Sequence, residues 1–267
     1  MLLVPLPPTL PGARMILGIR CPAMSPGARL SRDIVRPVSQ NMAKLANCIR
    51  AVIFDFDGTL ADSFQAIACS VNYVRAELGL SALSLEEVRR HVGRGALHLL
   101  RQTVPGAEPA SLLDKYRRHH EQVMFSLTHL MPGAAETIAK LRENNIRLAV
   151  CSNKPVDFTR RLLEHFLPRG SVAVVLGPEE VPRPKPAPDM LLEALRRLAV
   201  PAEQALYVGD MDVDIQAARQ AAIRVLVVPT GAQTADYLTS FKPDGILASL
   251  GDLPAYLQQH FCNNRSS

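Results

Sequence analysis

Several features that are common in proteins are missing from this 267-residue sequence, and each absence excludes something. No run of 18 or more apolar residues occurs, so we expect no membrane-spanning helix and no membrane partner. The five cysteines are scattered and show no C-x-x-C spacing, which argues against a disulfide framework and a zinc site. We therefore expect a reducing, cytoplasmic environment. Hydrophobic residues make up 48% of the chain, which is enough for a globular core.

Residues 1–48 lack aromatic side chains, and residues 1–50 contain a single acidic one, Asp33. Seven prolines interrupt the segment and no helical or strand period runs through it, so it cannot bury enough surface to fold alone. The prolines also break the apolar core that a secretory signal needs. We expect a disordered extension, an organelle-targeting segment, or a gene model that is too long and truly begins at Met42.

The net positive charge of +5 comes from that first segment. Residues 1–50 hold seven basic residues and one acidic residue, a balance of +6. The rest of the chain holds 30 − 7 = 23 basic and 25 − 1 = 24 acidic residues, a balance of −1. Because the part that should fold has no excess of basic residues, we expect no nucleic-acid partner. That the basic extension is a tether to an anionic surface stays an open alternative.

After residue 50, short apolar runs alternate with amphipathic helical patterns. Runs of Val, Ile and Leu that are separated by helices are typical of a parallel sheet covered on both faces. We therefore predict an α/β fold with a doubly wound parallel sheet. The expected strands are 51–55, 146–153, 172–177, 205–210, 223–231 and 244–249, and helices are expected at 133–145, 189–199 and 215–222.

The interval 64–128 breaks this alternation because its pattern is helical throughout. Apolar residues recur every three or four positions at its start, as in an amphipathic helix. Ser84 and Glu87 form a capping-box signal for a second helix. The second and third helices are expected at 88–104 and 109–127.

Roughly 65 helical residues are too many for a crossover between neighbouring strands and suit a small cap domain. Asp62 and Ser63 would then mark the hinge into the cap. The predicted parts are an extension at 1–48, a core at 49–63 and 130–255, a helical cap at 64–129 and a tail at 256–267.

Two carboxylates stand at the end of the first expected strand, where "AVIFDFDGTLADS" places Asp55 and Asp57 one residue apart. Residues i and i+2 of a strand point to the same side, so both can face one site. A buried charge without a partner is costly, so we expect a cation to hold this pair. Gly58 and Thr59 follow with a flexible turn and a hydroxyl donor.

The remaining unusual polar residues also fall at the carboxyl ends of expected strands, where ligands bind in open α/β sheets. They are Ser152, Asn153, Asp210, the following helix residue Asp214, and Lys185 in the loop "RPKPAPD". A nucleophile, a second carboxylate, hydroxyl and amide donors and a lysine together suit phosphoryl transfer.

The chemistry assigns a role to each type of residue. A carboxylate that attacks a phosphate dianion needs a hard cation with oxygen ligands, so we expect Mg²⁺. Asp55 would attack phosphorus to form an aspartyl phosphate, and Asp57 would protonate the leaving oxygen and later activate water. The expected supporting roles are metal binding by Asp210, ordering of the ligands by Asp214, and contacts from Ser152 and Lys185 to the phosphoryl oxygens.

Four motifs in this order, "DFDGTLADS", "CSNKP", "RPKPAPD" and "GDMDVD", resemble those of the haloacid dehalogenase-like phosphohydrolases. The resemblance covers about residues 50–250 and implies a Rossmann-like core with a helical cap. Dehalogenases of the superfamily lack the second aspartate, so Asp57 favours phosphate chemistry. The implied sites are catalytic Asp55 and Asp57, phosphate-binding Thr59, Ser152, Asn153 and Lys185, and the metal ligands Asp55, Asp57, Asp210 and Asp214.

The run "MPGAAETIAKLRENNIRLAVCSNKP" is similar to phosphoglycolate phosphatases, which implies hydrolysis of 2-phosphoglycolate. The open alternatives are a phosphatase of a sugar phosphate, nucleotide or pyrophosphate, a sugar phosphomutase, and a non-catalytic binding module. The sequence departs from the family pattern at Met211, where Ser or Thr is usual, and at Ala222, where Gly is usual. We expect Met211 to cost a hydrogen bond near the metal, and Asp212 to be a solvated surface charge.

The cap should select the substrate, because it closes over the leaving group. Arg94, between two glycines in "VGRG", is the candidate for binding a small carboxylate. Adjacent histidines point apart on a helix, so we interpret His119 and His120 as a polar helix face and not as a metal pair. The expected partner is a small phosphorylated metabolite, and the expected state is a monomer or homodimer.

Overall fold

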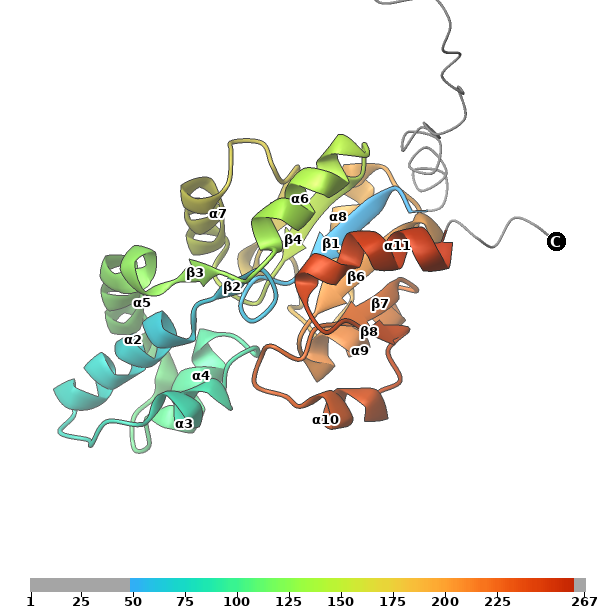
Figure 1. Cartoon of the computed structure of the whole chain (residues 1–267). Helices are drawn as coiled ribbons and strands as arrows, with labels where there is room; N and C mark the ends of the chain where they lie inside the picture. The colour runs from blue at the N-terminus through green and yellow to red at the C-terminus, as the bar shows by residue number, and fades with distance from the viewer. Residues whose placement is uncertain (1–48, 262–267) are drawn as a thin grey trace, which may run out of the picture. The chain divides into compact units, whose positions relative to one another are not determined.

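The computed structural model describes residues 49–261, and its central element is a six-stranded parallel sheet (Figure 1). The strands are β1 (Ala51–Phe54), β4 (Arg147–Cys151), β5 (Val174–Leu176), β6 (Ala205–Gly209), β7 (Arg224–Val227) and β8 (Gly245–Ile246). Their order in the sheet is β5-β4-β1-β6-β7-β8. Counted along the chain this is the doubly wound order 3-2-1-4-5-6, whose topological switch point lies between β1 and β6. The predicted fold class is confirmed.

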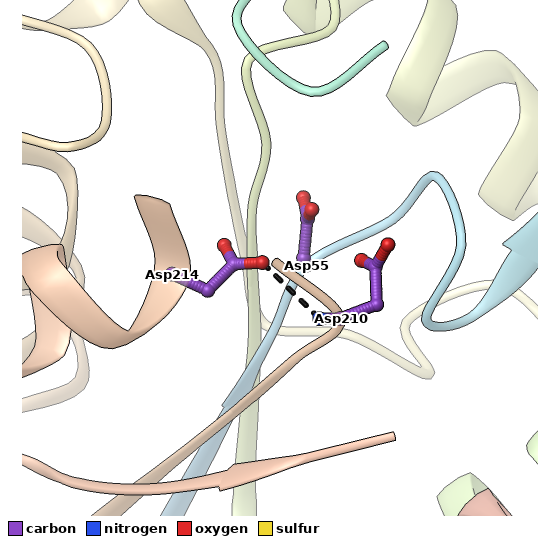
Figure 2. A group of neighbouring side chains, drawn as sticks. All are labelled: Asp55, Asp210 and Asp214. Atoms are coloured by element: carbon purple, nitrogen blue, oxygen red, sulfur yellow. Dashed lines mark hydrogen bonds between the residues drawn. The ribbon is translucent and has the colours of Figure 1, made fainter. Parts of the chain in front are cut away.

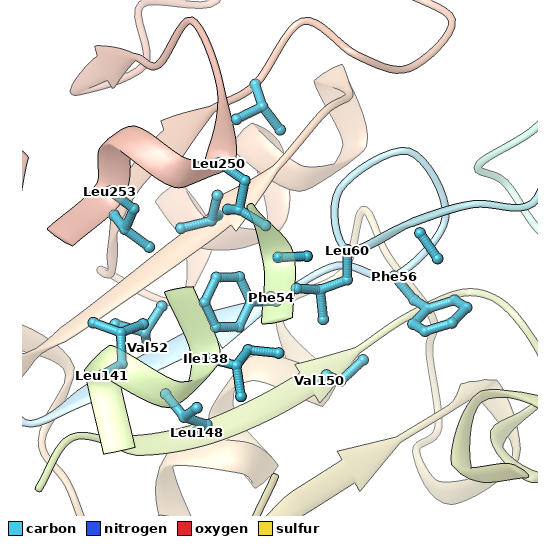
Figure 3. Close-up of a cluster of buried hydrophobic side chains, with 14 of the residues drawn as sticks. Val52, Phe54, Phe56, Leu60, Ile138, Leu141, Leu148, Val150, Leu250 and Leu253 are labelled. Atoms are coloured by element: carbon cyan, nitrogen blue, oxygen red, sulfur yellow. The ribbon is translucent and has the colours of Figure 1, made fainter. Parts of the chain in front are cut away.

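Strand β1 lies in the middle of the sheet because it pairs with β4 on one side and with β6 on the other. Side chains alternate along it, so Val52 and Phe54 join one apolar cluster while Ala51 and Ile53 join another. Figure 3 shows the cluster around Phe54. The backbone N of Asp55 donates to Val208 O over 2.9 Å, which carries the pairing one residue beyond the strand and fixes where Asp55 emerges.

Helices cover both faces of the sheet, as Figure 1 shows. The face with Phe54 is covered by α6 (Ala134–Glu143), α7 (Val156–Phe166) and α11 (Leu253–Phe261). The opposite face is covered by α8 (Asp189–Leu198), α9 (Asp212–Gln220) and α10 (Ala235–Ser240). Three short 3₁₀ segments, Pro178–Glu180, Ala202–Gln204 and Leu250–Asp252, complete these connections.

Between β2 (Ala61–Asp62) and β3 (His129–Leu130) the chain forms four helices that we call the helical insertion. They are α2 (Phe64–Glu77), α3 (Leu85–Arg89), α4 (Ala96–Thr103) and α5 (Pro109–Leu127). Their apolar faces form a cluster of their own. Strands β2 and β3 form an antiparallel pair that lies where the insertion leaves and rejoins the core (Figure 1). The predicted domain boundaries stay a prediction.

One helix expected at 88–104 is in fact two. The capping box of Ser84 and Glu87 is present, and it begins the short helix α3. The chain then leaves helical geometry before α4, because Gly93 and Gly95 adopt φ angles of +108° and +85°. Such angles are open to glycine and strained for other residues, so "VGRG" forms a loop between the two helices.

Other expectations concern lengths and termini. The expected strands are shorter in the structure, and α7, α10 and the β2–β3 pair were not predicted from the sequence. The extension expected at 1–48 lies outside the described residues, as do residues 262–267 of the expected tail. None of the helices within residues 49–261 is both long enough and apolar enough to cross a membrane.

Candidate active site

Three buried aspartates gather at the topological switch point of the sheet (Figure 2). Asp55 follows β1, Asp210 follows β6, and Asp214 lies in the first turn of α9. Each offers a carboxylate oxygen, and these oxygens all lie within 4.8 Å of one another. The local cause is the parallel pairing of β1 with β6, which brings the carboxyl ends of both strands to the same edge.

Asp214 orders this edge of the sheet through both of its oxygens. Its Oδ2 accepts hydrogen bonds from the backbone N of Asp210 over 3.2 Å and of Met211 over 3.0 Å (Figure 2 shows the first). Its Oδ1 accepts from Lys185 Nζ over 2.7 Å and from the Tyr207 hydroxyl over 2.9 Å. The Asp214 side chain therefore holds the turn that carries Asp210.

Lys185 lies between two of the aspartates and is 3% exposed. Its Nζ lies 2.9 Å from Asp55 Oδ1, 2.7 Å from Asp214 Oδ1 and 2.9 Å from the Tyr207 hydroxyl oxygen. Burial lowers the pKa of Lys185, but the charges of Asp214 and Asp55 outweigh it and raise the pKa above its usual value. Lys185 is therefore charged, and its three protons have three partners.

The three aspartates and Lys185 carry a formal charge of −3 + 1 = −2 when all are ionised. Burial, with the charge of Asp214, raises the pKa of Asp55 to about 6 despite the opposing effect of Lys185. Burial and the charges of Asp214 and Asp55 raise the pKa of Asp210 well above its usual value. The negative charge of these carboxylates is not balanced by Lys185 alone. A divalent cation would balance it.

A direct test of the fit to a metal ion is whether a carboxylate oxygen is left for it. Asp210 Oδ2 is buried and has no hydrogen-bond partner among the described residues. Two glycines surround it: a Cβ would lie 2.4 Å from this oxygen at Gly58 and 1.7 Å from it at Gly231. The site therefore offers a bare oxygen ligand and keeps side chains away from it. This donor set fits Mg²⁺, which takes carboxylate oxygens.

Asp57 lies apart from this group and has partners of its own. Lys154 Nζ lies 3.2 Å from Asp57 Oδ1 and 3.4 Å from Asp57 Oδ2, and the Ser63 hydroxyl donates to Asp57 Oδ1. The carboxylate of Asp57 is not among the three that could share a metal ion. The metal role expected for Asp57 stays a prediction.

Three residues expected to bind phosphate have different surroundings. Thr59 Oγ1 donates to Asp210 Oδ1 over 3.0 Å, so its proton is already used. Asn153 joins two loops, because its Nδ2 donates to Gly93 O and Lys185 O, each over 2.9 Å, and its Oδ1 accepts from Lys185 N. Ser152 lines the pocket beside Asp55. Their contacts with phosphate stay predictions.

A pocket that is open to solvent, with about 480 Å³ of empty space, lies between these residues and the helical insertion. Its polar wall contains Asp55, Asp57, Ser152 and Lys154 from the core, and Tyr116 and His120 from α5. Its apolar wall contains Ile67, Val92, Leu99 and Phe158. Both the sheet edge and the insertion therefore face whatever binds there.

The structure places Arg94 elsewhere. Its guanidinium forms an ion pair with Asp212 over 2.8 Å, and it does not line the pocket of Asp55, whereas Gly93 and Gly95 do. The prediction that Asp212 is a solvated surface charge is wrong, because Asp212 is 4% exposed. It also exchanges two hydrogen bonds with Gln233, of 2.7 and 2.9 Å. Substrate binding by Arg94 stays a prediction.

The interpretation of His120 as part of a polar helix face is also wrong. His120 is 1% exposed, and its Nε2 has no hydrogen-bond partner among the described residues. Burial and the charge of Lys154 lower the pKa of His120 to about 2, so the ring is neutral. Its Nδ1 lies 3.2 Å from the Ser70 hydroxyl, which itself donates to Ala66 O over 2.9 Å. We assign the proton to Nδ1, which leaves Nε2 as an acceptor.

The sequence interpretation missed three polar residues that bond to the aspartates of the site. Lys154 was quoted in a motif without a role, and Tyr207 was hidden in the apolar pattern of a strand. Ser63 was taken only as a hinge residue. The hydroxyl of Tyr207 within an otherwise apolar strand was a signal that could have identified this residue.

A family model described as haloacid dehalogenase-like hydrolase matches residues 52–228, which include Asp55, Asp57, Lys154, Lys185, Asp210 and Asp214. The chain belongs to this family. In this hydrolase the matched residues include Asp55, Lys185 and Asp210, and they cover all of the parallel sheet except β8 and the first residue of β1.

Two kinds of relatives agree with this membership. A phosphoglycolate phosphatase of Nitrosospira multiformis is 32% identical over 219 residues, covering 79% of this chain and 96% of that protein. The crystal structure of a haloacid dehalogenase-like hydrolase from Bacteroides fragilis has a TM-score of 0.73 at 27% identity, covering 77% and 99% of the two chains. The structure of CbbY from Rhodobacter sphaeroides in complex with phosphate has a TM-score of 0.68 at 26% identity, covering 77% and 96%.

Proposed function

We propose that 2-phosphoglycolate is the substrate of this phosphatase and that Mg²⁺ is its cofactor. The observation that carries the proposal is the arrangement of Asp55, which is paired with Lys185 beside two further carboxylates and faces a pocket that also contains Asp57. A nucleophile and a second carboxylate on one pocket suit two-step hydrolysis of a phosphate ester. The similarity to phosphoglycolate phosphatases names the ester.

The reaction would proceed through the side chains of this chain. An Asp55 oxygen attacks phosphorus, the bond from phosphorus to the leaving oxygen breaks, and Asp57 gives its proton to that oxygen. Water then attacks the aspartyl phosphate and gives a proton to Asp57, which frees phosphate and restores Asp55. Asp214 and Lys185 keep Asp55 and Asp210 in place throughout.

Asp55 and Asp210 would hold Mg²⁺, with Asp214 beside them. When bound, the ion neutralises carboxylate charge and lowers the repulsion that a phosphate dianion meets at this site.

A hydroxylated ester, such as a sugar phosphate, is the second candidate. His120 Nε2 is a buried acceptor on the pocket wall that has no partner among residues 49–261, and a substrate hydroxyl would satisfy it. A carboxylate offers no proton to this atom at neutral pH, so the two candidates make different demands on the pocket.

The proposal is tested by measuring phosphate release from a panel of phosphorylated metabolites, with and without Mg²⁺. We expect 2-phosphoglycolate to have the highest kcat/KM, and Mg²⁺ removal by chelation to abolish turnover. Asp55→Asn should lose at least about 10³-fold in kcat, because it removes the nucleophile. Asp157→Asn, at a side chain that is 72% exposed, is the matched control. Undiminished turnover by Asp55→Asn would refute the nucleophile, and equal turnover of many esters would refute the named substrate.

A further inference from the structure

Lys154 is a buried lysine in the wall of the active-site pocket. Its side chain is 4% exposed, and among residues 49–261 the carboxylate that it pairs with is Asp57. Its backbone N donates to Ser152 Oγ over 3.3 Å, so Lys154 is anchored directly behind the end of β4. Burying an ammonium group costs desolvation free energy, which only a negative partner offsets. The position of Lys154 therefore suits the binding of anions.

Lys154 differs in charge from the other residues that line the pocket. His120 is neutral, Arg94 pairs with Asp212, and neither Arg94 nor Lys185 lines this pocket. Among the described residues that line it, Lys154 is thus the one cation. An anionic group that extends from the phosphate into the pocket meets a single positive charge.

The surroundings of Lys154 strengthen its interaction with an anion. Ile67, Leu99 and Phe158 form the apolar side of the same pocket. Charges attract more strongly where apolar walls exclude water than they do at an exposed surface. The attraction between Lys154 and a carboxylate on the leaving group would therefore be stronger than the attraction to a half-exposed side chain such as Arg94.

We propose that Lys154 is a specificity-determining residue that binds a carboxylate on the leaving group of the substrate. This inference rests on the proposed function, and it names the chemical class of the ester: a small phosphate monoester with a carboxylate close to the ester oxygen. The role follows from two observations: Lys154 lines the pocket, and its ammonium group lies beside the proposed catalytic Asp57.

Binding of such a substrate exchanges one ion pair for another. Lys154 now lies within 3.4 Å of both Asp57 oxygens, and Ser63 also donates to Oδ1. Both oxygens are engaged. A substrate carboxylate that draws Lys154 Nζ toward itself frees Asp57 Oδ2 to carry the proton that Asp57 gives to the leaving oxygen. A neutral leaving group leaves the Lys154–Asp57 pair closed, so selectivity should appear in kcat/KM.

The experiment compares two esters that differ at one end. 2-Phosphoglycolate and 2-hydroxyethyl phosphate have the same chain length, but the second carries a hydroxymethyl group in place of the carboxylate. For the full chain with Mg²⁺, we expect kcat/KM for 2-phosphoglycolate to exceed that for the neutral ester by about 10²-fold or more, the size of a buried charge contact. Lys154→Met should reduce this ratio to within about fivefold of one, and Lys154→Arg should keep most of it.

Lys115→Met is the matched control, because Lys115 lies on the insertion with a side chain that is 42% exposed and pairs with Glu77. It should leave the ratio unchanged. If Lys154→Met does not fold, inhibition of the wild-type chain decides: glycolate should inhibit at least about tenfold more strongly than 1,2-ethanediol. Equal inhibition would overturn the inference.

The remaining outcomes separate this inference from the proposed function. A wild-type preference for 2-phosphoglycolate that survives in Lys154→Met overturns the role of Lys154 and leaves the substrate standing. A wild-type preference for 2-hydroxyethyl phosphate overturns the role of Lys154 and the named substrate. It favours the hydroxyl contact to His120 and leaves the phosphatase activity standing. Absence of Asp55-dependent release from any ester refutes the proposed function, and the inference with it.

Discussion

Gly93 of the helical insertion lies directly against Met211 at the start of α9, since a Cβ on Gly93 would be 2.1 Å from Met211 Sδ. The Gly93 carbonyl also accepts a hydrogen bond from Asn153 Nδ2. Met211 thus forms a packing contact between the core and the insertion, and the loss of a hydrogen bond expected at this position stays a prediction. The loop that lines the pocket at Gly93 can approach Met211 this closely because residue 93 has no side chain.

Gly93→Ala should lower both stability and activity. Its φ angle of +108° strains alanine, and the added methyl group must displace the Met211 side chain. We expect a loss of about 1–3 kcal/mol in the free energy of unfolding and at least tenfold in kcat/KM. Gly106→Ala is the control, because Gly106 has a φ angle of +78° with open space around it. A double variant with Met211→Ala should recover activity, and a failure to recover would show that backbone strain alone is responsible.

Asp210→Asn should separate metal binding from catalysis. Asparagine removes one of three clustered carboxylates, so the metal-free variant should unfold at a higher temperature than the metal-free wild type. Saturating Mg²⁺ should stabilise the wild type by about 2–4 kcal/mol and the variant by much less, measured by thermal unfolding. An equal effect of Mg²⁺ on both proteins would place the ion elsewhere.

Lys185→Met should strongly destabilise the metal-free protein. The substitution leaves Asp55 and Asp214 buried without their cation, and breaking a buried pair in this way costs about 3–5 kcal/mol. Urea unfolding measures the change. Lys140→Met, at an exposed position of α6, should stay within about 0.5 kcal/mol of the wild type. A similarly small change in Lys185→Met would mean that water already reaches the cluster.

His120 predicts how stability depends on pH. Its pKa is lowered to about 2 in the folded chain, while an unfolded histidine titrates near 6.5. The folded state therefore resists protonation, and its stability is complete above pH 6.5 and falls as the pH decreases below that value. His120→Gln should remove about 2 kcal/mol of the loss between pH 7.5 and pH 5. His129→Gln, at an exposed position, is the control, and identical slopes for both variants would contradict the burial of His120.

Arg94→Ala tests the substrate role predicted from the sequence. Because Arg94 pairs with Asp212 through a side chain that is 42% exposed, we expect about 1 kcal/mol or less of destabilisation. The fall in kcat/KM should be the same for 2-phosphoglycolate and 2-hydroxyethyl phosphate. A loss confined to 2-phosphoglycolate would support the contact between Arg94 and a carboxylate.

Much of the fold could be predicted because it depends on local patterns. The apolar runs of β1, β4 and β6 and the helical periods between them indicate the doubly wound sheet before any contact is known. The lengths of the strands and the breaks within helices were harder to predict. The single helix expected at 88–104 failed because periodicity was weighed above the two glycines that end it.

The candidate site divides in the same way. That Asp55, Asp210 and Lys185 come together follows from their positions after parallel strands. Which partner each polar side chain takes does not follow. Thr59 bonds to a residue 151 positions away, Arg94 to one 118 away and Lys154 to one 97 away.

The sequence by itself determined the α/β class, the helical interval and the edge of the sheet where the carboxylates meet, because each is encoded in periods of two to four residues and in strand ends. Only the tertiary structure decided that Lys154 pairs with Asp57, that His120 is buried and neutral, and that Arg94 forms an ion pair with Asp212. The physical reason is that burial and ion pairing depend on which distant side chains share a space, and no local pattern records that.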